Sequence, residues 1–146
     1  NWGALLLWAA HTGSLGLAPI LLYAAGFVWT LFYDTIYAHQ DREDDALIGV
    51  RSTARLFAEN TPRWLAGFLI ATVTLMAAAA ITALLPLASP WPLLVALAGV
   101  WAMGLHMFTQ LRRLNIDDPA GCLILFRSNR DTGLIPALFL AAAALV

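Results

Sequence analysis

The stretch WLAGFLIATVTLMAAAAITALL, residues 64 to 85, contains 22 residues and no charged side chain. A helix rises about 1.5 Å per residue, so this stretch is long enough to cross a hydrocarbon layer of about 30 Å. Residues 93 to 111 have the same character over 19 residues, with His106 and Gln110 as the strongly polar members. Two such segments predict an all-α protein that spans a membrane.

The composition supports the same prediction. Hydrophobic residues make up 61% of the 146 residues and charged residues only 12%, against roughly 25% charged in soluble domains. A third apolar segment, residues 17 to 33, ends at Asp34 and predicts a helix from 17 to about 40. Residues 1 to 10 and 133 to 146 are apolar but each too short for a full span. We therefore expect one piece of a larger polytopic transmembrane helix bundle.

The charged residues gather in two windows, residues 34 to 63 and 112 to 131, and each window contains four arginines. Apolar segments separate the windows, so both are expected as loops on the same side of the membrane. The positive-inside rule assigns that side to the cytoplasm. The absence of lysine and a net charge of -1 make nucleic acid an unsuitable partner.

Five acidic residues lie within twelve positions at the end of the third apolar segment. On a helix continued to the residues before Gly49, Asp34, Asp41 and Asp45 fall within about 40° of one another, because successive residues turn by about 100°. Tyr37 and Asp44 lie beside them on the same side. Acids grouped on one face at a membrane boundary indicate a functional site.

Carboxylate oxygens are the ligands that Mg²⁺ and Ca²⁺ prefer, and Mg²⁺ is commonly held by one or two carboxylates and by phosphate oxygens of a substrate. Asp41 and Asp45, one helical turn apart, fit such a site. The residues alone leave two other interpretations open: a solvated loop whose acids pair with Arg42, Arg51 and Arg55, and a pathway for cations.

The segment YDTIYAHQDREDDALIGVRSTARLF, residues 33 to 57, resembles the second aspartate-rich motif of the UbiA superfamily of intramembrane prenyltransferases, in the form found in the 4-hydroxybenzoate polyprenyltransferase branch. Weaker similarity covers GLAPILLYAAGFVWTLFYD, residues 16 to 34, and FRSNRDTGLI, residues 126 to 135. The resemblance implies that residues 1 to 146 are the C-terminal part of one transmembrane prenyltransferase domain. About four to five helices of a nine-helix bundle are then expected.

The resemblance also implies an activity. Family members use two aspartate-rich motifs to hold Mg²⁺ on the diphosphate of an isoprenoid. In the implied branch, a polyprenyl group passes from polyprenyl diphosphate to the ring of 4-hydroxybenzoate, a step of ubiquinone biosynthesis. The resemblance implies an active site within the lipid bilayer. For this chain we expect that bilayer to be a bacterial inner membrane or an equivalent. Acceptors used elsewhere in the family are a naphthoate, homogentisate, a tetrapyrrole or a sugar.

Carried onto this sequence, the resemblance makes Asp41 and Asp45 the metal ligands, with Asp44 as an outer or alternative ligand. Asp34 is expected in the catalytic site, either near the metal or holding Tyr37 and an arginine. The candidates for binding the diphosphate or the benzoate are Arg42, Arg51, Arg55 and Tyr37. Arg127, Asn129 and Arg130 are expected in a cap over the site.

The family's first aspartate-rich motif, of the N-D-x-x-D-x-x-x-D type, does not occur in these residues, and NIDDPAG at residues 115 to 121 lacks its spacing. We therefore expect the N-terminal half of the domain to lie outside residues 1 to 146 and this piece alone to be inactive. A divalent-cation transporter and a noncatalytic scaffold remain as alternative functions.

Overall fold

The computed structural model describes residues 1–49 and 51–146, apart from the side chains of Glu43, Asp44 and Ala46. The described residues form helices and connecting turns, without a strand. In chain order the elements are α1 (Trp2–Thr12), α2 (Leu17–Ala38), α3 (Arg42–Ile48), α4 (Thr53–Phe57), the 3-10 turn η1 (Ala58–Asn60), α5 (Thr61–Leu84), α6 (Trp91–Arg113) and α7 (Pro119–Ala143). The expectation of an all-α, partial transmembrane helix bundle is confirmed.

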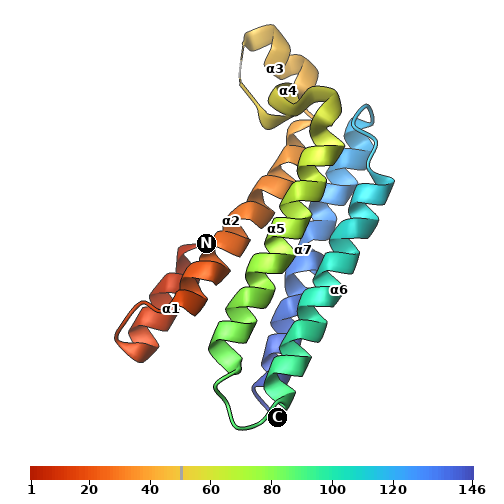
Figure 1. Cartoon of the computed structure of the whole chain (residues 1–146). Coiled ribbons are helices and arrows are strands. Elements are labelled where there is room, and N and C mark those ends of the chain that lie inside the picture. Colours follow the sequence, from red (N-terminus) through yellow and green to blue (C-terminus); the bar gives the residue numbers. More distant parts are fainter. Residues whose placement is uncertain (50) are drawn as a thin grey trace.

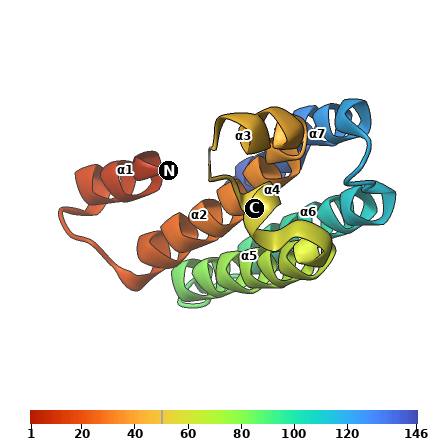
Figure 2. The same ribbon diagram turned by 90° about the horizontal axis from the view of Figure 1, so that it is seen from above.

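Four long helices, α2, α5, α6 and α7, form the bundle (Figure 1). Each contacts two neighbours around a ring, in the order α2, α5, α6, α7 and back to α2. Seen from above, α1 lies outside this ring beside α2, and it leaves the upper part of α2 uncovered (Figures 1 and 2). The short helices α3 and α4 lie over the end of the bundle where α2 finishes and α5 begins.

The ends of the helices follow from particular residues. Proline occupies the first turn of α5, α6 and α7, where its missing N–H removes no hydrogen bond from the helix. The Oδ1 atom of Asp118 accepts a hydrogen bond of 3.0 Å from the main-chain N–H of Gly121 and so caps α7. Gly49 ends α3 with a φ of 77°, a left-handed conformation that suits glycine.

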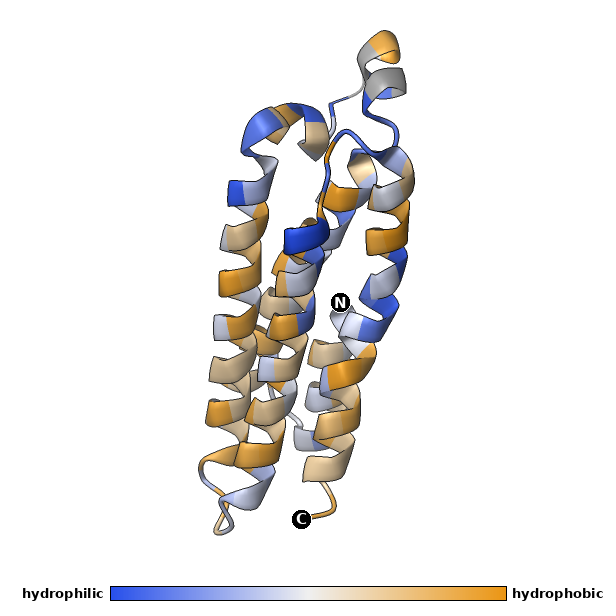
Figure 3. Ribbon diagram, turned by 90° about the vertical axis from the view of Figure 1, so that its right-hand side faces the viewer, coloured by the Kyte–Doolittle hydropathy of each residue, from blue (hydrophilic) through white to orange (hydrophobic). Residues whose placement is uncertain are grey.

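The centre of the bundle is apolar and closely packed. Fully buried side chains come from all four bundle helices: Phe32, Ile36, Leu65, Met103, Met107 and Cys122. The outer surface is apolar as well, since Ile70 is 64% exposed and Trp101 is 78% exposed. Within the part of the chain that the structure describes, three segments are long and apolar enough to cross a membrane: Leu17–Ala38, Thr53–Leu84 and Trp91–Arg113. They correspond to the three spans predicted from the sequence, with ends that differ by a few residues. Hydrophilic residues gather towards the end that carries α3 (Figure 3).

The prediction of one helix running from residue 17 almost to Gly49 is wrong. Helix α2 ends at Ala38, and α3 begins at Arg42 after a turn. His39 ends α2, and its buried imidazole Nε2 lies 3.1 Å from the hydroxyl of Thr61 at the start of α5. This contact ties the turn to the bundle, so Asp34 is on a different helix from Asp45. The predicted single face of carboxylates therefore does not form.

The second charged window is also not a loop. Helix α6 continues through Arg113, and α7 starts at Pro119, so only residues 114–118 connect them. Residues 133 to 146, expected as a short apolar segment, form the end of the 25-residue helix α7. Arg127, Arg130 and Asp131 lie within this helix, at positions that contact solvent or lipid on the surface of the described structure. The apolar residues that follow position 132 thus continue the helix that contains these charged residues.

The turn at His39 predicts a dependence of stability on pH. Burial lowers the pKa of His39 from its ordinary value of 6.5, and the nearby Arg42 lowers it further, whereas Asp117 raises it. An unfolded chain therefore takes up a proton on this residue at a higher pH than the folded chain does. The contribution of neutral His39 to stability is complete above about pH 6.5 and is lost as the pH falls below it.

We expect the melting temperature of the whole protein in detergent to fall more steeply between about pH 7 and pH 5 than that of His39→Gln. Glutamine can still bond to Thr61 but does not titrate. The two proteins are compared by thermal unfolding over this pH range. Parallel curves would show that His39 is not the residue responsible.

Candidate functional site

The acidic segment lies at one end of the bundle, in the turn after α2 and in α3. Asp41 is exposed and Asp45 is half-buried. The main-chain N–H of Asp45 donates a hydrogen bond of 2.8 Å to the carbonyl oxygen of Asp41, so the two residues are one helical turn apart. Asp41 precedes α3 without a capping hydrogen bond from its side chain. The structure thus keeps the spacing expected for Asp41 and Asp45.

Two of the predicted arginines have partners in this region. The Nη1 atom of Arg55 in α4 donates a hydrogen bond of 3.1 Å to the main-chain oxygen of Asp45, which holds α4 against α3. Arg42 lies 4.0 Å from the carboxylate of Asp117 in the connector before α7. Arg51 is exposed between α3 and α4. The arginines therefore surround the acidic segment, and Arg42 links it to the second polar connector.

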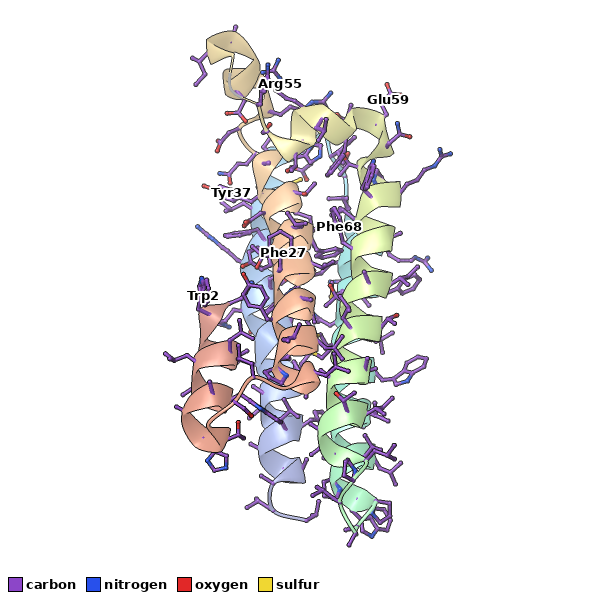
Figure 4. All side chains as sticks on the ribbon, turned by 60° about the vertical axis from the view of Figure 1, so that its left-hand side comes forward. Trp2, Phe27, Tyr37, Arg55, Glu59 and Phe68 are labelled. Atoms are coloured by element: carbon purple, nitrogen blue, oxygen red, sulfur yellow. The ribbon has the colours of Figure 1, made fainter. Side chains whose placement is uncertain are left out.

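The other predicted residues are on α2. Asp34 is exposed, and Tyr37 is 40% exposed on the side of α2 away from α5 (Figure 4). The ring of Tyr37 contacts the ring of Phe126 on α7, with centroids 4.7 Å apart. Tyr37 therefore lies on α2 beside α7, one residue before the helix ends at Ala38, and Asp34 precedes Tyr37 by about one helical turn.

The described carboxylates of this region, Asp41 and Asp45, could supply part of the ligands of a metal ion. Among the described residues, no three His, Cys, Asp or Glu side chains come together in a group that could hold a metal ion. The side chain of Asp44, the third predicted ligand, is outside the described residues. Two carboxylates one turn apart suit Mg²⁺, which is commonly held by one or two carboxylates and completed by water or phosphate oxygens.

The structure also contains a second polar region, formed by residues expected in a cap and by aromatic residues that were not predicted as site residues. A hollow on the α2–α7 face is lined by aromatic and polar side chains: Trp29, Tyr33, Phe126, Arg127, Asn129 and Arg130. The last three were expected in a cap, but they lie along α7 in the side of the bundle. Trp29, Tyr33 and Tyr37 follow at intervals of four residues, a spacing that was visible in the sequence and places them on one face of a helix.

Long apolar helices that carry acids and arginines at one end define a polytopic membrane protein with a polar site at that end. The UbiA prenyltransferase family model matches residues 1–145, and the chain belongs to this family. It is 48% identical over 138 residues to the mitochondrial 4-hydroxybenzoate polyprenyltransferase of Drosophila melanogaster, which covers 92% of this chain and 33% of that protein. The mitochondrial proteins of the same name from Bos taurus and Homo sapiens are 46% and 45% identical over 136 residues, covering 92% of this chain and 35% of each.

The chain thus spans about a third of the length of the curated relatives it matches. No solved structure matches it. The names of these relatives place them in mitochondria, so the bacterial inner membrane expected from the sequence stays a prediction.

Proposed function

We propose that the whole protein transfers a polyprenyl group from polyprenyl diphosphate to the ring of 4-hydroxybenzoate, and that residues 1–146 supply the second aspartate-rich motif. The observation that carries the proposal is the pair Asp41 and Asp45, held one turn apart at the polar end of a bundle that belongs to the prenyltransferase family. The names of the similar proteins supply the acceptor.

In this proposal Asp41 and Asp45 hold Mg²⁺, with Asp44 beside them. The ion would neutralise charge on the diphosphate as it leaves, which is how a metal promotes the loss of a phosphate group. Asp41 is exposed and Asp45 half-buried, so both are within reach of a ligand arriving from the polar end. The main-chain bond from Arg55 to Asp45 keeps α3 in place while the carboxylate of Asp45 binds metal.

The arginines would bind anions at the same end. A guanidinium group donates parallel hydrogen bonds to phosphate or carboxylate oxygens. Arg51 is exposed beside the acidic segment and is a diphosphate ligand in this proposal. Arg42 pairs with Asp117 at a separation of 4.0 Å, where both side chains are accessible, so an anionic substrate can compete for it. Exposed ion pairs of this kind contribute little free energy, so a substrate anion can displace Asp117 from Arg42 at little cost.

The apolar surface of the bundle fits the other end of the donor. A polyprenyl chain is a hydrocarbon, and the exposed side chains along the membrane-spanning helices are apolar, including Phe27 on α2 and Leu134 on α7. We propose that the polar end faces the cytoplasm or the compartment equivalent to it, as the arginine distribution indicates. The diphosphate of the donor then binds at the membrane surface while its polyprenyl chain remains in lipid.

The test uses the whole protein, purified in detergent or reconstituted in vesicles. It is expected to move a labelled prenyl group from the diphosphate to 4-hydroxybenzoate, to lose this activity with a chelator and to regain it with Mg²⁺. If the protein transfers the prenyl group to a naphthoate or homogentisate instead, the proposed reaction class is correct and the proposed acceptor is wrong. Divalent-metal flux in vesicles without diphosphate, and no transfer to any acceptor, would replace the proposal with the transporter hypothesis.

A further inference from the structure

The α2–α7 face has a cluster of aromatic rings just below the acidic segment. The rings of Trp29 and Tyr33 are 5.5 Å apart and nearly perpendicular, at 79°. Phe126 on α7 lies 5.9 Å from Tyr33 and 4.7 Å from Tyr37. Tyr37 is in the last turn of α2, so the cluster lies next to the turn that leads to Asp41. We call Trp29, Tyr33 and Phe126, with the hollow that they line, the aromatic hollow.

Other residues hold these rings in place. The Nε1 atom of Trp29 donates a hydrogen bond of 3.1 Å to Oδ1 of the buried Asn129, whose Nδ2 atom donates to the main-chain oxygen of Leu125. A Cβ atom on Gly133 would lie 2.7 Å from the indole ring of Trp29, so glycine at this position lets the ring lie against α7.

The hydroxyl of Tyr33 donates to the hydroxyl of Thr30 at 3.2 Å. Together with the indole bond to Asn129, this satisfies the polar edges of both α2 rings. Their faces remain the part that another molecule can contact. Fixed rings with satisfied edges form a prearranged surface for stacking, which is how binding sites limit the loss of side-chain freedom.

Two arginines complete the hollow. Arg127 and Arg130 are both exposed and line it from α7. They are about 12 and 16 Å along the axis from the start of that helix, at about 1.5 Å per residue. Exposed guanidinium groups beside a hollow can donate paired hydrogen bonds to a carboxylate. Arg130 uses its Nε atom in a 3.0 Å pair with Asp131 on the same surface.

We propose that the aromatic hollow is the subsite for the acceptor, and that it recognises a small aromatic carboxylate. The ring of the acceptor would stack on the face of Trp29 and meet the ring of Tyr33, which is nearly perpendicular, edge to face. The guanidinium groups of Arg127 and Arg130 would bind its carboxylate. The hollow measures about 320 Å³, at the lower end of the range of about 300–1,000 Å³ typical of small-molecule sites. This inference rests on the proposed prenyl transfer and assigns one of its two substrates to named residues.

Chemistry favours the acceptor over the diphosphate here. A diphosphate carries several charges and no ring, and metal-binding carboxylates lie at the acidic segment rather than in the aromatic hollow. Paired rings beside guanidinium groups match a molecule that has one ring and one carboxylate. The acceptor would then lie on the membrane side of the acidic segment, adjacent to Asp34 and the first carbons of a donor whose diphosphate is held at Asp41 and Asp45.

The experiment compares two acceptors in the whole protein, 4-hydroxybenzoate and 4-hydroxybenzamide, which differ in the charge of the group that the arginines would bind. For Arg127→Gln and Arg130→Gln we expect the KM for 4-hydroxybenzoate to rise about 10- to 100-fold, because charge-assisted hydrogen bonds are lost. The preference for the acid over the amide should shrink by the same factor, and the KM for the prenyl diphosphate should stay within about twofold. Arg112→Gln, an exposed arginine at the end of α6, is the matched control and should change none of these values.

Further variants keep the test decisive. If a glutamine variant does not fold, Arg127→Lys preserves the charge without the paired donors and should give an intermediate loss of preference. Binding is also followed without turnover: 4-hydroxybenzoate should quench tryptophan fluorescence, and Trp29→Phe should remove that change.

Three outcomes would overturn the assignment: an unchanged preference in both arginine variants, a raised KM for the diphosphate instead of the acceptor, or quenching that persists in Trp29→Phe. Each presupposes that the unaltered protein transfers a prenyl group. Absence of transfer to every acceptor would instead refute the proposed function, so the two failures are distinguishable.

Discussion

Replacing Asp45 with asparagine in the whole protein is expected to lower the rate of prenyl transfer at least about 10²-fold, as does loss of a single preorganised stabilising group in other enzymes. Asparagine is nearly the same size but lacks the negative charge that attracts Mg²⁺. The substitution leaves the main-chain oxygen of Asp45, which accepts a hydrogen bond from Arg55, in place. Asp41→Asn should have a comparable effect, because the two carboxylates would share the metal.

The measurement is the initial rate of prenyl transfer over a range of Mg²⁺ concentrations, together with the amount of folded protein in the membrane. Glu59→Gln is the matched control, since Glu59 is another exposed acid at the same end of the bundle, on η1 (Figure 4). It should retain full activity. Normal rates in both aspartate variants, at normal Mg²⁺ requirement, would remove Asp41 and Asp45 from the metal site.

Replacing Gly99 with alanine is expected to have the largest effect on stability. Gly99 is buried on α6, and a Cβ atom there would lie 2.4 Å from the Cβ atom and 2.9 Å from the Cγ atom of Phe139 on α7. The side chain of Phe139 cannot avoid the clash by rotating, because its own Cβ atom is the nearest neighbour. Forcing extra atoms into a packed interior typically costs about 1–3 kcal/mol, so α6 and α7 should separate or shift.

Gly67→Ala on α5 is the matched control for this prediction. Both glycines are within membrane-spanning helices, but a Cβ atom on Gly67 would meet nothing within 4 Å. Alanine favours a helix over glycine by about 1 kcal/mol, so this variant should be as stable as the unaltered protein or slightly more stable. Melting temperatures of the two variants in the same detergent measure the difference. Equal values would show that the α6–α7 contact tolerates expansion at Gly99.

The acidic segment could be read from the sequence because its signal is local. The acidic residues lie within residues 33 to 57, and Asp41 and Asp45 stay one helical turn apart in the structure. The continuous helix expected around them could not have been ruled out in the same way. It ends at Ala38, where the side chain of the next residue, His39, is buried against Thr61 in a helix that begins more than twenty residues later.

The aromatic hollow needed the tertiary structure. The spacing of Trp29, Tyr33 and Tyr37 was visible, but the sequence does not state which helix would meet this face. Contacts with Phe126, Asn129 and Gly133 join segments about 100 residues apart in the chain. The same contacts hold α7 against α2. Arg127 and Arg130, which were expected in a loop, therefore lie on the side of the bundle.

By itself, the sequence determined that the chain is a helical membrane protein, where its three apolar spans lie and which end carries the acidic motif. These properties depend on length, hydropathy and the spacing of neighbouring residues, since a helix satisfies its own backbone hydrogen bonds within the bilayer. Tertiary structure alone decided where α2 stops, that α7 runs through the second charged window, and which side chains meet across the α2–α7 face. Those outcomes depend on packing between distant segments, because small residues such as Gly133 and Gly99 set how closely one helix approaches another.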